Sequence, residues 1–262
     1  MKMCVFSFTV TTVLMSVLAN TPASRTRPIS AMDPAKRAAY EKAQGGMVTP
    51  RDNGNRLLIW DASGASGNIV TAFTNMVDRL WHIPAVIKTD KADTGLYKQA
   101  KRVKSPKYPC VIMLGEAGPE GPALSVYPEE AIACINRSAL ADGDEDVHRK
   151  RIQKELYRAF GFTCGGYAIN RTACAMDIAF SVEDLDANRA VLLAPMRYSG
   201  INRAAARLGL PVLRATTYQQ AVRQGWAPPP TNDLQKAIWE KNKDLPSLMP
   251  GMNPLQPRPK ND

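Results

Sequence analysis

Hydrophobic residues in the first half of the chain alternate between short continuous runs and helical spacing. Continuous apolar runs over residues 56–61, 84–89 and 108–114 are typical of buried strands. Residues 68–81 predict an amphipathic helix, with the apolar positions Ile69, Phe73, Met76, Val77 and Leu80. Residues 95–103 predict a second, shorter helix. This alternation predicts a mixed sheet with at least one helix on its face.

The middle of the chain predicts the end of the sheet and then one long helix. Residues 115–122 are rich in glycine and proline and form a loop, and the runs 124–127 and 131–136 are strand-like. Residues 144–161 predict the strongest helix. Its first turn is acidic, which the helix macrodipole favours. We expect Gly161 to end this helix in the left-handed conformation.

The last third predicts three shorter helices, over residues 199–209, 216–225 and 232–241. Ser199 is expected to cap the first. Thr216 is expected to cap the second, with Gln219 completing a capping box.

The remaining segments predict the domain limits. Residues 20–55 are polar and predict a linker with one short helix over 34–44, and residues 56–245 form one domain. The tail, residues 246–262, is rich in proline, and we expect it to be disordered.

The first 19 residues have the pattern of a secretory signal peptide. Lys2 supplies the positive start, residues 5–18 are apolar, and small residues allow cleavage near Ala19 or Ala23. The apolar run is shorter than the ~20 residues that a membrane span needs. We therefore expect an exported protein, periplasmic or extracellular, with no membrane span after cleavage.

Export changes what is expected of the cysteines. Cys110, Cys134, Cys164 and Cys174 remain after the leader, and in an oxidising compartment four cysteines allow three disulfide pairings. A Cys164–Cys174 disulfide is preferred, because Gly165 and Gly166 between them can turn sharply. Four buried thiols are the alternative.

The charge balance bears on partners. The formal net charge is +10, while hydrophobic residues make up 45% of the chain and charged residues 22%, as in ordinary globular proteins. The basic residues look dispersed, and no nucleic-acid-binding motif is present, so a nucleic-acid partner is not expected. An acidic polymer or an anionic cell surface suits an exported basic protein, and a merely soluble basic surface is the alternative.

Residues 154–164 have the spacing of a known metal motif. Their sequence, Lys-Glu-Leu-Tyr-Arg-Ala-Phe-Gly-Phe-Thr-Cys, resembles the extended zinc motif of metzincin peptidases, His-Glu-x-x-His-x-x-Gly-x-x-His. The glutamate of the motif falls on Glu155 and its glycine on Gly161. The three histidine positions fall on Lys154, Arg158 and Cys164.

A second element of the same family follows. Cys174-Ala-Met176 resembles the Cys-x-Met of archaemetzincin-like peptidases, whose methionine lies under the metal. The resemblance covers residues 56–186 and implies an α+β, zincin-like fold, with a mixed sheet, an active-site-type helix and a helical C-terminal part.

The zinc ligands themselves are missing. Histidines at positions i and i+4 can bind one zinc ion from a helix face, but Arg158 stays protonated and cannot bind a metal. Lys154 has an ordinary pKa near ~10.4, which leaves Cys164 as the one possible ligand. The chain has two histidines, His82 and His148, and neither completes a set. No metal or other cofactor is therefore predicted.

These residues predict a catalytically inactive, exported, metzincin-like protein with a binding or envelope-associated role. Its partner is unknown; a peptide or an anionic surface polymer fits best. Glu155 is a vestigial base, and an ion pair with Arg151 or Arg158 on the same helix is its expected state. The alternatives are a peptidase with an atypical site around Glu155 and Cys164, and a binder of acidic surface polymers.

A separate glycine-containing loop, residues 63–67, lies between a strand and a helix. It resembles a phosphate cradle only weakly, and a simple turn is the favoured interpretation.

Overall fold

The computed structural model describes residues 33–91, 95–164, 166, 174–242 and 245. The predicted signal peptide and the predicted tail, residues 246–262, lie outside these ranges. The chain divides into two units, Met1–Tyr40 and Glu41–Asp262. Helix α1 (Pro34–Ala43) spans the boundary and confirms the short helix expected over residues 34–44. Within the described ranges, no helix combines the length and the apolar character needed to cross a membrane.

A mixed five-stranded sheet organises the second unit, with strand order β3-β2-β4-β6-β5. Strands β3, β2, β4 and β6 run parallel to one another, whereas the edge strand β5 is antiparallel to β6. The central strands are buried on both faces, as expected for parallel strands covered by helices. The bounds are β2 (Leu57–Asp61), β3 (Ala85–Lys88), β4 (Cys110–Gly115), β5 (Leu124–Tyr127) and β6 (Ile132–Asn136).

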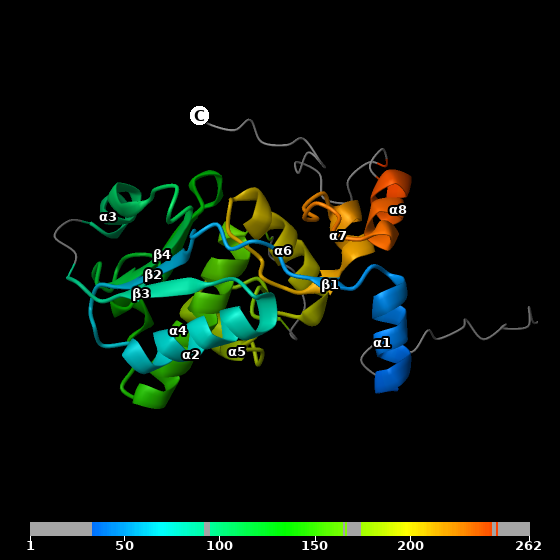
Figure 1. Ribbon diagram of the computed structural model, residues 1–262. Helices are drawn as coiled ribbons and strands as arrows, with labels where there is room; N and C mark the ends of the chain where they lie inside the picture. Colours follow the sequence, from blue (N-terminus) through cyan, green and yellow to red (C-terminus); the bar gives the residue numbers. More distant parts are fainter. Residues whose placement is uncertain (1–32, 92–94, 165, 167–173, 243–244, 246–262) are drawn as a thin grey trace, which may run out of the picture. The chain divides into compact units, whose positions relative to one another are not determined.

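Helices cover both faces of this sheet (Figure 1). Helices α2 (Gly67–Trp81) and α4 (Glu145–Thr163) pack on one face, where Phe73 meets Tyr157 with ring centroids 5.0 Å apart. Helix α3 (Leu96–Val103) packs on the opposite face through Ala100. The mixed sheet and the long helix predicted from the sequence are thus confirmed.

The end of α4 differs from the prediction. The helix continues through Gly161 to Thr163, and Gly161 does not take a left-handed conformation. Its importance is steric: a β-carbon at Gly161 would lie 2.5 Å from Sδ of Met176. The glycine is therefore needed for a close approach and not for a turn.

The helices after α4 are short. They are α5 (Val182–Ala187), α6 (Tyr198–Arg207), α7 (Tyr218–Gln224) and α8 (Asp233–Asn242), accompanied by the 3-10 turns η2 (Pro128–Glu130), η3 (Ser138–Leu140) and η4 (Pro195–Arg197).

Two of the predicted helix caps were wrong. Ser199 lies inside α6, which has Arg197 at its N-cap without a side-chain bond. Thr217 rather than Thr216 caps α7, by accepting from the amide of Gln220. In both cases the helix boundary is shifted from the polar residue that the local sequence favours.

A second, two-stranded sheet joins distant parts of the chain. Strand β1 (Met47–Val48) pairs antiparallel with β7 (Thr216–Thr217). Nearby, the side-chain amide of Gln235 donates to the carbonyl of Gly45 at 2.8 Å. The segment predicted as a polar linker therefore contains a short strand.

Candidate functional site

Helix α4 carries the residues that occupy the zinc-motif positions. Asp144 caps the helix by accepting from the amides of Asp146 and Val147, and Glu145 and Asp146 lie in its first turn, as predicted. Further along, Lys154, Glu155 and Arg158 are 7%, 4% and 7% exposed. Long charged side chains are almost never this buried unless they are paired. Their partners therefore decide what the site can do.

Arg158 ties the helix to the chain segment that follows it. Its Nε donates to Oε2 of Glu155 at 3.1 Å, and its Nη1 donates to the carbonyl of Asp177 at 2.5 Å. A longer contact of 3.4 Å reaches the carbonyl of Ala175. The guanidinium thus links Glu155 to the segment that contains Met176.

Glu155 is held in an ion pair inside the protein. Burial raises the pKa of its carboxyl group, and the neighbouring Arg158 opposes part of that rise. A general base must reach the water or substrate whose proton it removes. The described contacts instead direct this carboxylate toward Arg158. This is one of the two ion pairs that were predicted for Glu155.

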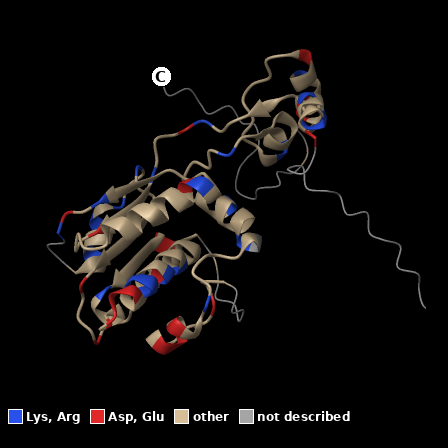
Figure 2. Ribbon diagram, turned by 90° about the horizontal axis from the view of Figure 1, so that it is seen from below, with Lys and Arg blue, Asp and Glu red and all other residues tan. Residues whose placement is uncertain are grey.

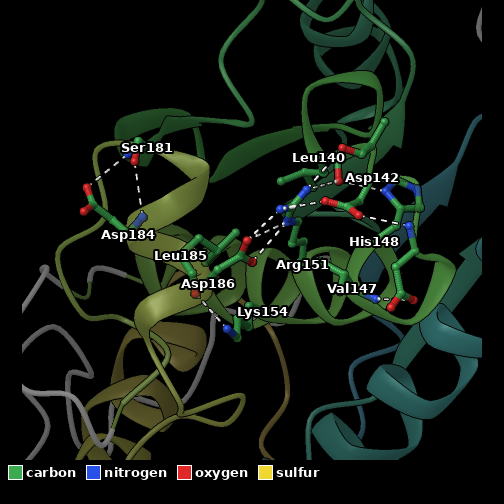
Figure 3. Close-up of polar contacts among 12 residues, drawn as sticks. Leu140, Asp142, Val147, His148, Arg151, Lys154, Ser181, Asp184, Leu185 and Asp186 are labelled. Carbon is green, nitrogen blue, oxygen red and sulfur yellow. Dashed lines mark hydrogen bonds and ion pairs between the residues drawn. The ribbon is translucent and has the colours of Figure 1, made fainter.

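Lys154 makes the second connection from α4. Its Nζ donates to the carbonyl of Leu185 at 2.7 Å, which attaches α5 to α4 (Figure 3). Burial lowers the pKa of this amine. Helix α5 begins with a capping box between Ser181 and Asp184, so Lys154 contacts a well-defined short helix.

Arg151 does not pair with Glu155, and that predicted alternative was wrong. Its guanidinium forms ion pairs with Asp186 at 2.6 Å and Asp142 at 3.0 Å (Figure 3). It also donates to the carbonyls of Leu140 and Ala141. Asp142 and Asp186 were missed from the sequence because both lie outside the helix, where spacing along it gives no information.

Both histidines lie away from the motif positions. His148 contacts the carbonyl of Leu140 through Nδ1 at 2.9 Å. His82 is the left-handed C-cap of α2. Each therefore has a local structural role.

The predicted Cys164–Cys174 disulfide is not formed, and this expectation was wrong. Cys110, Cys134, Cys164 and Cys174 are all buried free thiols. Cys164 is hydrogen-bonded to Cys110 on β4, and this bond and burial raise the pKa of Cys164 well above its ordinary value. Cys174 instead accepts from the amide of Ala194 at 3.4 Å. The two cysteines have different neighbours, so the preferred pairing does not form.

The side chain of Met176 packs against the end of helix α4. It is fully buried, and both Gly161 and Gly166 have their backbones against its side chain. The amide of Gly166 also donates to the carbonyl of Gly161 at 2.9 Å. The two glycines therefore make room for one methionine.

The loop over residues 63–67 binds a carboxylate from its own chain. Asp61, which is fully buried at the end of β2, accepts from the amides of Ser63, Gly64 and Ser66 at 3.2, 3.1 and 2.8 Å. The hydroxyl of Ser63 adds a fourth bond to the same carboxylate. A phosphate would need these amides, so the geometry favours the simple turn.

The zinc ion implied by a zincin-like fold does not fit the residues at the motif positions. Lys154 and Arg158 supply cationic donors that already bind carbonyl oxygens and Glu155. Cys164 is directed to Cys110. Across the described ranges, no three side chains of His, Cys, Asp or Glu gather as a metal site would require.

Comparison of the fold with solved structures finds archaemetzincins. The archaemetzincin of Methanopyrus kandleri matches with a TM-score of 0.50 and 16% identity, covering 60% of this chain and 98% of that one. The archaemetzincin of Archaeoglobus fulgidus (TM-score 0.43, 16% identity, 55% and 99% covered) and a zinc-dependent peptidase of Methanocorpusculum labreanum (0.42, 13%, 56% and 100%) also match. No protein-family model and no curated protein sequence matches the chain. The likeness shows the zincin-like fold expected from the sequence.

Proposed function

We propose that this zincin-like chain is an exported protein that has lost peptidase chemistry and acts by binding a partner. Export rests on the signal-peptide pattern of residues 1–19. Loss of chemistry rests on the contacts of helix α4. The binding role is supported by the zincin-like fold and by the formal net charge of +10.

The observation that carries the proposal is the Arg158–Glu155 ion pair. Metalloprotease chemistry needs a metal-bound water and a free glutamate that takes its proton. Here the guanidinium lies at a ligand position of the motif and binds the glutamate itself, at 3.1 Å. A permanently protonated side chain cannot be a ligand. Arg158 therefore leaves one zinc-ligand position without a ligand, and its ion pair keeps Glu155 from acting as the base.

Lys154 supports the same conclusion and narrows the binding role. Because its amine and the Arg158 guanidinium bind Leu185, Asp177 and Glu155, these cations serve internal connections. A ligand carboxylate or phosphate is therefore not expected between them. The partner is expected to bind another surface of the protein.

Metal analysis of the purified full chain tests the loss of chemistry. After incubation with zinc and removal of free metal, we expect no stoichiometric zinc by mass spectrometry and no cleavage of a diverse peptide library. Glu155→Gln is the matched control, and it should leave both readings unchanged. Stoichiometric zinc that disappears on Cys164→Ser, together with cleavage that disappears on Glu155→Gln, would establish the atypical peptidase instead.

Export is tested separately. N-terminal sequencing of the protein recovered outside the cytoplasm should give a start after Ala19 or Ala23. Recovery of the uncleaved chain in the cytoplasm alone would contradict this part of the proposal.

A further inference from the structure

Five basic residues lie close together in a short segment that contains no acidic residue. The whole chain has 34 basic and 24 acidic residues, and Figure 2 shows Lys and Arg on many elements. Residues 95–108 combine five closely spaced basic residues with no Asp or Glu. We call these five the basic α3 surface: Lys98, Lys101, Arg102, Lys104 and Lys107. This local excess equals half of the formal net charge of +10.

The fold turns this charge outward. Helix α3 packs on the sheet with its apolar side, through Leu96 and Ala100. Lys98, Lys101 and Arg102 are exposed. They stand three and four positions apart, so they share one helix face with about 5–6 Å between neighbouring β-carbons.

Internal acids neutralise only part of the surface. Glu130, from η2, lies 3.3 Å from Lys101 and accepts from the hydroxyl of Tyr97 at 2.6 Å. The Lys101 side chain nevertheless stays 61% exposed. Lys98 and Lys107 form no ion pair with any residue in the described ranges, and the Lys107 amine stands 5.6 Å from the ring of Tyr108. The amines of Lys98 and Lys107 therefore remain available to a partner.

We propose that the basic α3 surface binds a linear polymer with a phosphate or carboxylate group on each repeat. This inference rests on the proposed binding role and names its partner class. Exposed lysines are strongly hydrated point charges on flexible stems, which suits a repeating anion without fixed geometry. A lipid bilayer is less suitable. The large apolar side chains that are exposed in the described ranges lie in other segments, at Tyr40, Met47, Ile178, Phe180, Leu192, Leu234 and Leu245.

Salt-dependent affinity tests the inference. Full-length protein is titrated into labelled inorganic polyphosphate and, separately, labelled poly-glutamate, from low to physiological salt. Release of counterions from the contacts of Lys98, Lys104 and Lys107 gives an expected slope of log affinity against log salt near about −2. Lys98→Gln/Lys107→Gln should bring the slope to about −0.7 and weaken binding roughly 10- to 30-fold near 0.1 M salt.

A charge-matched control separates this surface from net charge. Lys236 and Lys241 are exposed on α8, and Lys236→Gln/Lys241→Gln removes the same charge there. The control should keep the wild-type slope, and circular dichroism should show that both variants are folded. Equal losses in the two variants would overturn the proposal, as would tighter binding to anionic vesicles than to either polymer. The affinity titration measures neither zinc binding nor peptide cleavage. The polymer-binding proposal can therefore fail while the proposed loss of peptidase activity still holds.

Discussion

Replacing Arg158 by methionine tests the central contact of helix α4. Methionine keeps a similar aliphatic stem but removes the guanidinium. Glu155, which is 4% exposed, then loses its ion-pair partner, and the carbonyl of Asp177 loses its donor. Breaking a buried ion pair by removing one partner typically costs about 3–5 kcal/mol.

The pH dependence of that cost follows from Glu155. Burial already raises its pKa in the folded protein, and loss of Arg158 raises it further. A raised folded pKa contributes stability that is present below the unfolded pKa and is lost as pH rises toward the folded pKa. With an unfolded pKa near ~4.3, protonating the buried carboxyl costs about 3.7 kcal/mol at pH 7 and about 1 kcal/mol at pH 5. The deficit of Arg158→Met should therefore be smaller at pH 5, by up to about 2.7 kcal/mol.

Urea unfolding at pH 5 and pH 7 measures both effects. In thermal unfolding at neutral pH, the loss of stability in Arg158→Met corresponds to a fall in Tm of roughly 6–20 °C for a domain of this size. The double variant Glu155→Gln/Arg158→Met lacks the titrating group, so its free energy of unfolding should change less between pH 5 and pH 7 than that of Arg158→Met. An Arg158→Met deficit below about 1 kcal/mol, or one that does not change with pH, would refute the buried ion pair.

Three further predictions concern the surroundings of this contact. Hydrogen bonding to Arg151 lowers the pKa of Asp186. The stability from this pair should therefore be present above the unfolded pKa near ~3.9 and lost as pH falls. Arg151→Gln should be less stable than wild type at pH 6, and this difference in stability should close in acid unfolding below pH ~3. Gly161→Ala places a β-carbon 2.5 Å from Sδ of Met176 and should lower the free energy of unfolding by about 1–3 kcal/mol. In a double-mutant cycle with Met176→Ala, the combined loss should be smaller than the sum of the two single losses by about 1 kcal/mol. The four described thiols are buried, namely Cys110, Cys134, Cys164 and Cys174. They should resist alkylation in the folded protein and react once it is denatured without reductant. A peptide linked through Cys164 and Cys174 in mass spectrometry would contradict the free thiols.

The parts of the fold that follow a local period could be predicted from the sequence. Helix α2 and strands β2, β4 and β6 lie within two residues of their expected limits, because apolar spacing and buried runs depend on neighbours along the chain. The Arg158–Glu155 pair was also predictable, since the two residues are three positions apart on one helix.

The rest depended on contacts between distant residues. Gly161 is a good helix-ending residue locally, but Met176 packs against it and the helix continues. Arg151 had an acceptable partner within α4, yet it binds Asp186, which is 35 residues away. Cys164 has a nearby cysteine in sequence but contacts Cys110, which the sheet brings to it. In each case the tertiary neighbour, which no local pattern contains, determined the outcome.

The loop over residues 63–67, whose amides bind the Asp61 carboxylate, disfavours the binding of a soluble anion. This carboxylate is covalently attached two residues before the first amide that it occupies, so dilution cannot lower its effective concentration. A free phosphate would have to displace this tethered competitor and leave a buried carboxylate without its hydrogen bonds. The start of α2 therefore resists nucleotides and phosphates even at concentrations that would saturate an open loop of the same shape.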